Sequence, residues 1–393
     1  MGACRINLGT DGISRRGVLR TGAFGATILF AGGCDLISPD ISEARAPWDA
    51  AGESFGDPRL DALAYAVLAP SPHNRQPWVI ELHAPDEVLV RAAPERLLPE
   101  TDPYNRQVVI GFGCFHELLR QAAAEAGYAL ETGVFPEGEP QPLLDDRPIF
   151  RARFVKTPDI ERDALFGYAL QRRTTRVPFN EDPVDAETLN RLDTALRPDD
   201  GEFEWANDAA NVTTLKALCK RAWRIEANSD GPHKESARLT RIGRREVVAD
   251  PDGISLYGRD IEALRLGGVL SRDSIAEIGS RAHREMIAFY ERAIDASQAF
   301  GWLTTDPNDR ADQLRAGAGW IRLNLAATRE GLAMQPLSQA LQEFPEMAAP
   351  YAEIHEFVGA RPSTCVQGLF RFGNAPPPPA SPRWPIQSRL AAS

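Results

Sequence analysis

A stretch of nine residues restricts the fold of this chain more than any other. Residues 70–78 read Pro-Ser-Pro-His-Asn-Arg-Gln-Pro-Trp. Three prolines at this spacing exclude a helix interior or a central strand, because proline fixes φ and lacks an N–H group. Apolar residues recur at helical spacing over 60–68, and apolar and polar residues alternate as in a strand over 79–83. The sequence therefore predicts a rigid loop between a helix and a strand, with its polar side chains held in fixed directions.

A second stretch concentrates positive charge. Residues 171–179 read Gln-Arg-Arg-Thr-Thr-Arg-Val-Pro-Phe, so three guanidinium and two hydroxyl groups fall within five residues. The whole chain is acidic, with 44 Lys and Arg against 55 Asp and Glu and a net charge of −11, which argues against nucleic acid as the main ligand. A local arginine cluster favours a small anion, since guanidinium forks match phosphate oxygens. Arginines at the end of a solvated helix are the alternative interpretation.

Two further stretches lie near the C-terminus. A predicted helix begins at Leu314 and ends at Gly331, and residues 331–338 read Gly-Leu-Ala-Met-Gln-Pro-Leu-Ser. Alone, this pattern is also typical of a helix C-cap followed by another helix. Residues 366–373 predict a final strand, and the proline-rich residues 374–389 predict an extended arm.

Together these stretches resemble the FMN-dependent nitroreductases, and the chain is most similar to their Acg-like branch. The resemblance implies that the loop at 70–76 contacts the flavin ring and that the arginine stretch binds the FMN phosphate. It also implies that the turn at 336–338 places backbone groups near flavin N5 and that an arginine of the tail adds a phosphate contact. The implied FMN-binding residues are Pro70, Ser71, Asn74, Arg75, Gln76, Arg172, Thr174, Arg176, Pro336, Leu337, Ser338 and Arg383.

The order of the stretches implies an internal pseudo-dimer. Ordinary members of the resembled family are homodimers in which the phosphate stretch comes first and the partner subunit supplies the ring loop. Here the ring loop comes first, and neither stretch occurs a second time. We therefore expect an α+β, nitroreductase-like fold of three layers of sheet and helix, in which two halves of one chain pair around one complete FMN site. The expected parts are a signal at 1–34, a linker at 35–56, a first half at 57–150, a second half at 151–373 and a Pro-rich tail at 374–393.

The N-terminal residues predict export. Residues 14–20 read Ser-Arg-Arg-Gly-Val-Leu-Arg, a close match to the twin-arginine export signal. The apolar run behind them, 21–30, is shorter than the roughly 20 residues that a membrane span needs, and fits the core of a signal peptide. The small residues before Cys34 resemble a lipobox, although cleavage nearby without lipidation is the alternative. We expect an exported protein that is periplasmic or anchored through Cys34 on the outer side of the membrane.

Motifs for covalent or metal chemistry are absent from the sequence. The chain has five cysteines and none forms a CxxC pair. No histidine and carboxylate spacing suits a metal site, and neither an acid–base dyad nor a Ser/His/Asp set is recognisable. The sequence therefore predicts no metal ligand and no catalytic side chain, which suits direct hydride transfer by a bound flavin.

The resemblance implies an oxidoreductase that transfers hydride from reduced FMN to a nitroaromatic or quinone-like acceptor. Export separates such an enzyme from cytoplasmic NAD(P)H. The alternative is therefore a flavin-binding or flavin-sequestering protein with little turnover, its site closed by the mainly helical segment 215–297. A third hypothesis is a solute-binding lipoprotein without flavin. The expected partner is a small-molecule electron acceptor rather than nucleic acid, and the expected state is a monomer built as an internal dimer.

Overall fold

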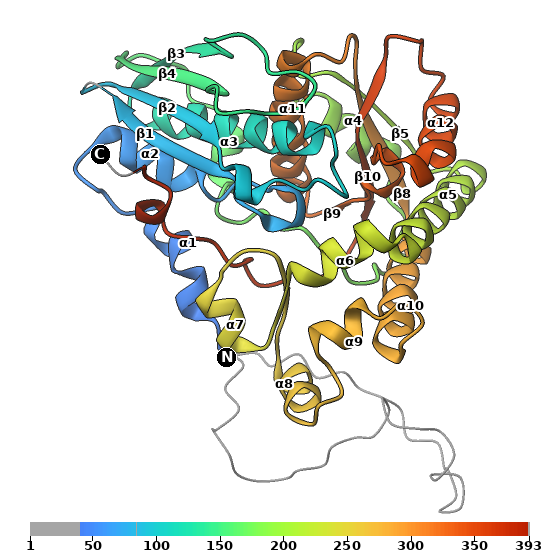
Figure 1. Cartoon of the computed structure of the whole chain (residues 1–393). Coiled ribbons are helices and arrows are strands. Elements are labelled where there is room, and N and C mark those ends of the chain that lie inside the picture. The colour runs from blue at the N-terminus through green and yellow to red at the C-terminus, as the bar shows by residue number, and fades with distance from the viewer. Residues whose placement is uncertain (1–39, 84, 392–393) are drawn as a thin grey trace, which may run out of the picture. The chain divides into compact units, whose positions relative to one another are not determined.

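Most strands of the chain belong to two four-stranded antiparallel sheets (Figure 1). The structure, a computed structural model, describes residues 40–83 and 85–391. The first sheet has the order β1–β2–β4–β3 and the second the order β5–β8–β10–β9. The first comprises β1 (Trp78–His83), β2 (Glu87–Ala92), β3 (Tyr128–Val134) and β4 (Phe150–Lys156), and the second comprises β5 (Glu202–Ala206), β8 (Ala299–Thr305), β9 (Ala333–Pro336) and β10 (Cys365–Gly373). A short parallel pair is formed by β6 (Thr240–Ile242) and β7 (Ile254–Leu256).

The same order of elements occurs twice along the chain. Each copy begins with a helix and two strands, continues with a helix of 20 residues and ends with two strands. The helices are α2 (Pro58–Ala66) and α3 (Arg106–Glu125) in the first copy, and α4 (Ala186–Asp193) and α11 (Arg310–Arg329) in the second. In both sheets the third strand of the copy lies at an edge and the fourth lies inside.

The two long helices lie between the sheets and cross with their backbones in contact (Figure 1). Gly113 of α3 and Gly317 of α11 meet at the crossing. A Cβ atom on Gly113 would lie 2.1 Å from the carbonyl oxygen of Leu314, and one on Gly317 would lie 2.1 Å from that of Ile110. Only glycine permits this approach, because interiors are close-packed and a Cβ here has no room. The two sheets, with the pair of long helices between them, form three layers. This arrangement confirms the predicted α+β fold.

A block of helices separates β5 from β8, and we call residues 209–295 the helical cover. Its helices are α5 (Ala209–Asn228), α6 (Asp230–Arg238), α7 (Arg244–Ala249), α8 (Arg259–Leu266), α9 (Arg272–Ala276) and α10 (Arg281–Asp295). Side-chain N-caps stabilise the first turns of the two longest helices, α5 and α10. Asp208 accepts from the N–H of Asn211, and Ser280 accepts from the N–H of His283. The predicted helical character of 215–297 is confirmed. Within the described residues, no helix combines the length and apolar character needed to cross a membrane.

The predicted linker is wrong for its described part. A 3₁₀ turn, Ser42–Arg45, leads into α1 (Ala46–Ala50), and Ile41 and Trp48 are buried. Pro47 lies in the first turn of α1, where its missing N–H leaves no helical hydrogen bond unmade. The composition resembles a tether, but these two apolar side chains dock the segment on the folded chain. The predicted signal and Cys34 lie outside the described residues.

The predicted boundary between the halves also needs correction. It divides the chain after residue 150, at the first residue of β4, yet β4 pairs with β2 and β3 of the first sheet. β4 therefore belongs with the first copy of the repeated order. The last helix, α12 (Ala348–Phe357), lies between β9 and β10 of the second copy, and β10 confirms the predicted final strand.

Replacing Gly317 with alanine should destabilise the protein, because the new methyl group cannot fit at the helix crossing. We expect the free energy of unfolding to fall by about 3 kcal/mol, at the upper end of typical overpacking effects. Urea unfolding followed by circular dichroism measures this change. Gly167→Ala is the matched control, since a Cβ there meets nothing within 4 Å. Equal stability of the two variants would contradict the described crossing.

Candidate functional site

The loop at 70–76 is held in an unusual backbone conformation. His73, Asn74 and Gln76 all have positive φ, at 46°, 52° and 48°. Non-glycine residues in this region each cost on the order of 1–3 kcal/mol unless the surroundings hold them there. Ser71 holds this loop, because its Oγ accepts from the Gln76 N–H at 2.9 Å and its carbonyl accepts from the Asn74 N–H at 2.9 Å. The predicted loop between α2 and β1 is confirmed.

The C-terminal tail binds this loop directly. Asn74 donates through Nδ2 to the carbonyl of Pro382 at 3.1 Å, and Arg383 donates through Nη1 to Asn74 Oδ1 at 2.7 Å. The same guanidinium donates through Nη2 to the carbonyls of Leu68 and Ala69 at 3.0 and 3.2 Å. Arg383 is thus buried, and it joins the tail to the end of α2 and to the loop.

The arginine stretch converges on the same place. Arg172 is buried at 3% exposure, and its Nη2 donates to the Leu68 carbonyl that also accepts from Arg383. Asn74, Arg172 and Arg383, which are far apart in the sequence, are therefore brought together. The neighbouring backbone joins the stretch to β9, since the Thr175 N–H donates to the Met334 carbonyl at 3.1 Å.

Trp48 packs against the arginines from the side of α1. Its ring centroid lies 5.4 Å from the guanidinium carbon of Arg172, 4.9 Å from that of Arg173 and 5.7 Å from that of Arg383. Its Nε1 donates to the carbonyl of Ser381 at 2.8 Å. Cation–π contacts of this kind are each worth about 0.5–2 kcal/mol and leave the positive charge in place. Sequence reasoning missed Trp48 because it falls in the supposed linker.

Positive charge in this cluster has no carboxylate partner in the part of the chain that the structure describes. Among the described residues, Arg172, Arg173, Arg176 and Arg383 form no ion pair. Burial lowers the pKa of Arg172 to about 10, and burial and the other three arginines lower the pKa of Arg383. Arg172 Nε is buried without a hydrogen-bond partner, and the exposed Arg176 donates to no described residue. The cluster therefore has both charge and free donors for an anion.

Arg75 and Gln76 are engaged elsewhere. Arg75 pairs with the buried carboxylate of Asp252 at 2.9 Å, which also pairs with Arg96 at 2.8 Å and Arg241 at 2.5 Å. Gln76 Nε2 donates to the carbonyl of Pro251 at 2.8 Å, and its Oε1 accepts from the Trp384 N–H at 2.8 Å. Both side chains tie the loop to the helical cover or to the tail, and their assignment as cofactor contacts stays a prediction.

The third predicted stretch forms the end of a strand. Pro336 is the last residue of β9 and lies opposite Phe370 of β10, and the Leu337 N–H donates to the Leu369 carbonyl at 2.8 Å. Ser338 then begins a 3₁₀ turn, Gln339–Leu341. Thr174 lies half-buried in the arginine stretch, and its side chain forms no hydrogen bond with another described residue. Their cofactor roles also stay predictions.

Between the loop and this strand end lies a polar group of residues that sequence reasoning did not assign. His73 Nε2 lies 3.3 Å from Ser236 Oγ of α6, and its Nδ1 is buried without a partner. Burial and the charge of Arg176 lower the pKa of His73 to about 4, so the ring is neutral at pH 7. Glu226 of α5 is 4% exposed, and Tyr290 of α10 accepts from Gln335 Nε2 at 3.0 Å. The one signal that the sequence offered for this group was the position of Glu226 on the apolar face of its helix.

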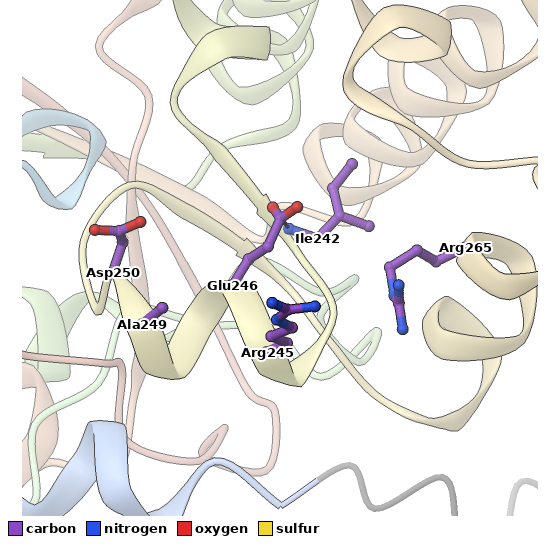
Figure 2. Close-up of a pocket in the computed structure, with 6 residues that line it drawn as sticks. All are labelled: Ile242, Arg245, Glu246, Ala249, Asp250 and Arg265. Carbon is purple, nitrogen blue, oxygen red and sulfur yellow. Dashed lines mark hydrogen bonds between the residues drawn. The ribbon is translucent and has the colours of Figure 1, made fainter.

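Two surface pockets lie outside this site. One of about 240 Å³ is lined by residues of β6, α7, α8 and the segment after α7 (Figure 2). Another of about 200 Å³ lies between α1, α2 and the tail. Neither is lined by the loop at 70–76 or by the arginine cluster. The described residues contain no group of three or more histidine, cysteine or carboxylate side chains that could hold a metal ion.

Comparison with known proteins gives sequence relatives over most of the chain. In Mycobacterium tuberculosis strain H37Rv, the protein named "Putative NAD(P)H nitroreductase acg" is 28% identical over 341 residues, which cover 83% of this chain and 92% of that protein. "Putative NAD(P)H nitroreductase Rv3131" is 26% identical over 336 residues, covering 82% and 87%. "Uncharacterized protein Rv3127" is 26% identical over 339 residues, covering 84% and 92%. No family model matches the chain.

Solved nitroreductase structures are similar to only part of the chain. The FMN-dependent nitroreductase NfnB of Mycobacterium smegmatis, in complex with NADPH, aligns at 17% identity and a TM-score of 0.34, covering 57% of this chain and 95% of that one. A nitroreductase with bound FMN from Bacteroides fragilis aligns at 13% identity and a TM-score of 0.32, covering 55% and 90%. Over 82–84% of its length, the chain is similar in sequence to these three mycobacterial proteins, two of them named as nitroreductases.

Proposed function

We propose that this chain is an FMN-dependent oxidoreductase of the nitroreductase type. The observation that carries the proposal is the meeting of Asn74, Arg172 and Arg383 at one place, in a cluster of arginines that has no carboxylate partner among the described residues. The similarity to proteins named as NAD(P)H nitroreductases supports the same reaction class. The acceptor would be a nitroaromatic or quinone-like small molecule.

The residues present fit FMN. Its phosphate is a dianion, and Arg172, Thr174 and Arg176 would hold it, since Arg172 Nε and the whole Arg176 guanidinium have no partner among residues 40–83 and 85–391. Ser71 and Asn74 would border the ring, and the backbone at Pro336–Ser338 would lie at its redox-active edge. When bound, FMN supplies two-electron chemistry, while the protein orients it and controls access.

We also infer that the chain is an internal pseudo-dimer with one complete site. The repeated order of helices and strands supports this proposal, as do the identical strand orders of the two sheets. The glycine pair at the crossing of α3 and α11 is the eighth residue of each helix, as expected for two related halves. The first half supplies the loop at 70–76 and the second supplies Arg172 and Arg176.

A flavin-sequestering protein with little turnover is the second candidate, and three contacts favour it. The turn at 251–253 of the helical cover binds the loop through Asp252 and Arg75, through Gln76 and through the Gly253 N–H, which donates to Asn74 O at 3.3 Å. If these contacts hold the helical cover over the loop, they would restrict access of an electron donor to the flavin ring.

Substituting Arg172 and Arg176 together by glutamine should abolish retention of FMN, because the phosphate loses its two main donors. Retention is measured as FMN absorbance per mole of protein after gel filtration. We expect at least a hundredfold weaker binding, about 3 kcal/mol at 1.4 kcal/mol per tenfold. The double variant Arg151→Gln/Arg153→Gln, on β4 away from the site, should retain FMN. Unchanged retention in the first variant would discredit the phosphate assignment.

Anaerobic absorption spectra separate the two candidate functions. For an oxidoreductase we expect NADH or NADPH to bleach the FMN bands, and a nitroaromatic or quinone to restore them. FMN that stays oxidised in excess NADH and NADPH would favour the sequestering protein. A colourless purified protein that takes up no added FMN would contradict both.

We propose further that the protein is exported by the twin-arginine route and anchored through a lipidated Cys34. If so, Cys34→Ala should move the protein from the membrane fraction to the soluble fraction in fractionated cells. Cys4→Ala is the matched control, since Cys4 precedes the twin arginines and would leave with the signal. A wild-type protein that already fractionates as soluble would rule out lipidation.

A further inference from the structure

Glu226 is a buried carboxyl group of the helical cover, and no described cation pairs with it. It lies on α5, is 4% exposed and forms no ion pair among the described residues. Its Oε1 lies 3.5 Å from Ser236 Oγ of α6, and the same hydroxyl lies 3.3 Å from His73 Nε2 of the loop. Glu226 is thus linked through one hydroxyl group to the loop that would border the flavin ring.

The other end of the carboxyl group faces the second stretch of the proposed site. Gln339 and Gln342 follow directly after the turn at 336–338, and both lie beside Glu226. Neither amide donates a hydrogen bond of normal geometry to Glu226 Oε2, which is buried without a partner. His73 Nδ1 is also buried without a partner. Each of these two buried polar atoms lacks a partner among the described residues, one on the loop and one beside the residues that follow the turn. Since buried polar groups are normally hydrogen-bonded, they indicate a polar ligand near this part of the site.

We propose that Glu226 donates the proton that accompanies hydride transfer to the acceptor, with Ser236 and His73 as the path by which that proton is replaced. This proposal rests on the proposed function. It assigns a role in the reaction to a residue of the helical cover rather than to the loop or the arginine cluster.

The step balances for both classes of acceptor. A nitroaromatic that takes up one hydride and one proton gives the nitroso compound and water. A quinone that takes up the same pair gives the hydroquinone. In each case the hydride with its two electrons would come from reduced FMN held at the proposed site. The O–H bond of the Glu226 carboxyl breaks, the proton moves to the oxygen of the acceptor, and the carboxylate regains a proton from solvent through the Ser236 hydroxyl.

The protonation state required for this role is favoured by the surroundings. Burial, with a smaller contribution from the carboxylate of Glu235, raises the pKa of the Glu226 carboxyl to about 7, although the neighbouring Gln342, Gln339 and Ser236 side chains lower it. Among the described residues, other titratable or charged groups near this place are His73 from the loop, Tyr290 from α10, Arg176 from the arginine stretch and Arg371 from β10, which donates to Gln335 Oε1. Glu226 therefore carries its proton below about pH 7 and loses it above, so proton donation should weaken as the pH rises through 7.

Infrared spectra of the full chain without FMN test the first requirement. We expect a carbonyl band of a protonated carboxylic acid that disappears with a midpoint near pH 7 in the wild type and is missing from the Glu226→Gln variant. Asp102 is also buried with a pKa raised to about 6, so the difference between wild type and variant isolates Glu226. A wild-type spectrum without this band at pH 6 would overturn the proposal.

Steady-state rates of acceptor reduction test the second requirement. In the wild type, kcat should fall tenfold per pH unit above about 7, and Glu226→Gln should lower kcat about a hundredfold at pH 6 while FMN affinity changes less than threefold. A kcat that is independent of pH from 6 to 9 in a wild type that binds FMN would overturn the role of Glu226 and leave the proposed function standing. Neither wild-type measurement depends on whether the variant folds. A wild type that binds no FMN would overturn both proposals.

Discussion

Buried positive charge beside Trp48 is the feature on which the rest of the site depends. Two buried guanidinium groups, Arg172 and Arg383, donate to one carbonyl, that of Leu68, with Arg173 and Arg176 close by. Bringing like charges together inside a protein is unfavourable by several kcal/mol unless opposite charge or fixed dipoles compensate. Carbonyl groups and the face of the Trp48 ring supply part of this compensation. A phosphate dianion at the unpartnered donors would supply the remainder. Binding of the phosphate would therefore also stabilise the folded protein.

The fold brings these arginines together by joining segments from three distant parts of the chain. The loop at 70–76 belongs to the first copy of the repeated order, the arginine stretch precedes α4 of the second copy, and Arg383 belongs to the tail. The crossing of α3 and α11 at Gly113 and Gly317 holds the two copies together at backbone distance. The helical cover then reaches the loop through Asp252, whose carboxylate compensates three further arginines.

Proline, arginine and glycine patterns predicted much of this arrangement. The loop between α2 and β1, the helical cover and the last strand follow from residue types with strong local preferences. The meeting of Asn74, Arg172 and Arg383 was implied by the resemblance to the FMN-dependent nitroreductases, because local preferences do not bring distant segments together. The role of Gln76 was harder to predict, because the partners of its amide, Pro251 and the Trp384 N–H, are set by tertiary contacts. The docked segment at 40–51 was missed because its composition resembles a linker, while its docking depends on single side chains such as Trp48. Glu226 was missed because its position on the apolar face of α5 was the one signal in the sequence, and that signal alone assigns no role to the carboxyl group.

A crystal structure of the protein grown with FMN is the most direct test of the central claim that distant segments close around one flavin. The account predicts one FMN per chain, with its phosphate in contact with Arg172 and Arg176 and its ring between the loop at 70–76 and the turn at 336–338. An FMN phosphate bound away from the arginine cluster, or a second equivalent FMN in the same chain, would contradict it.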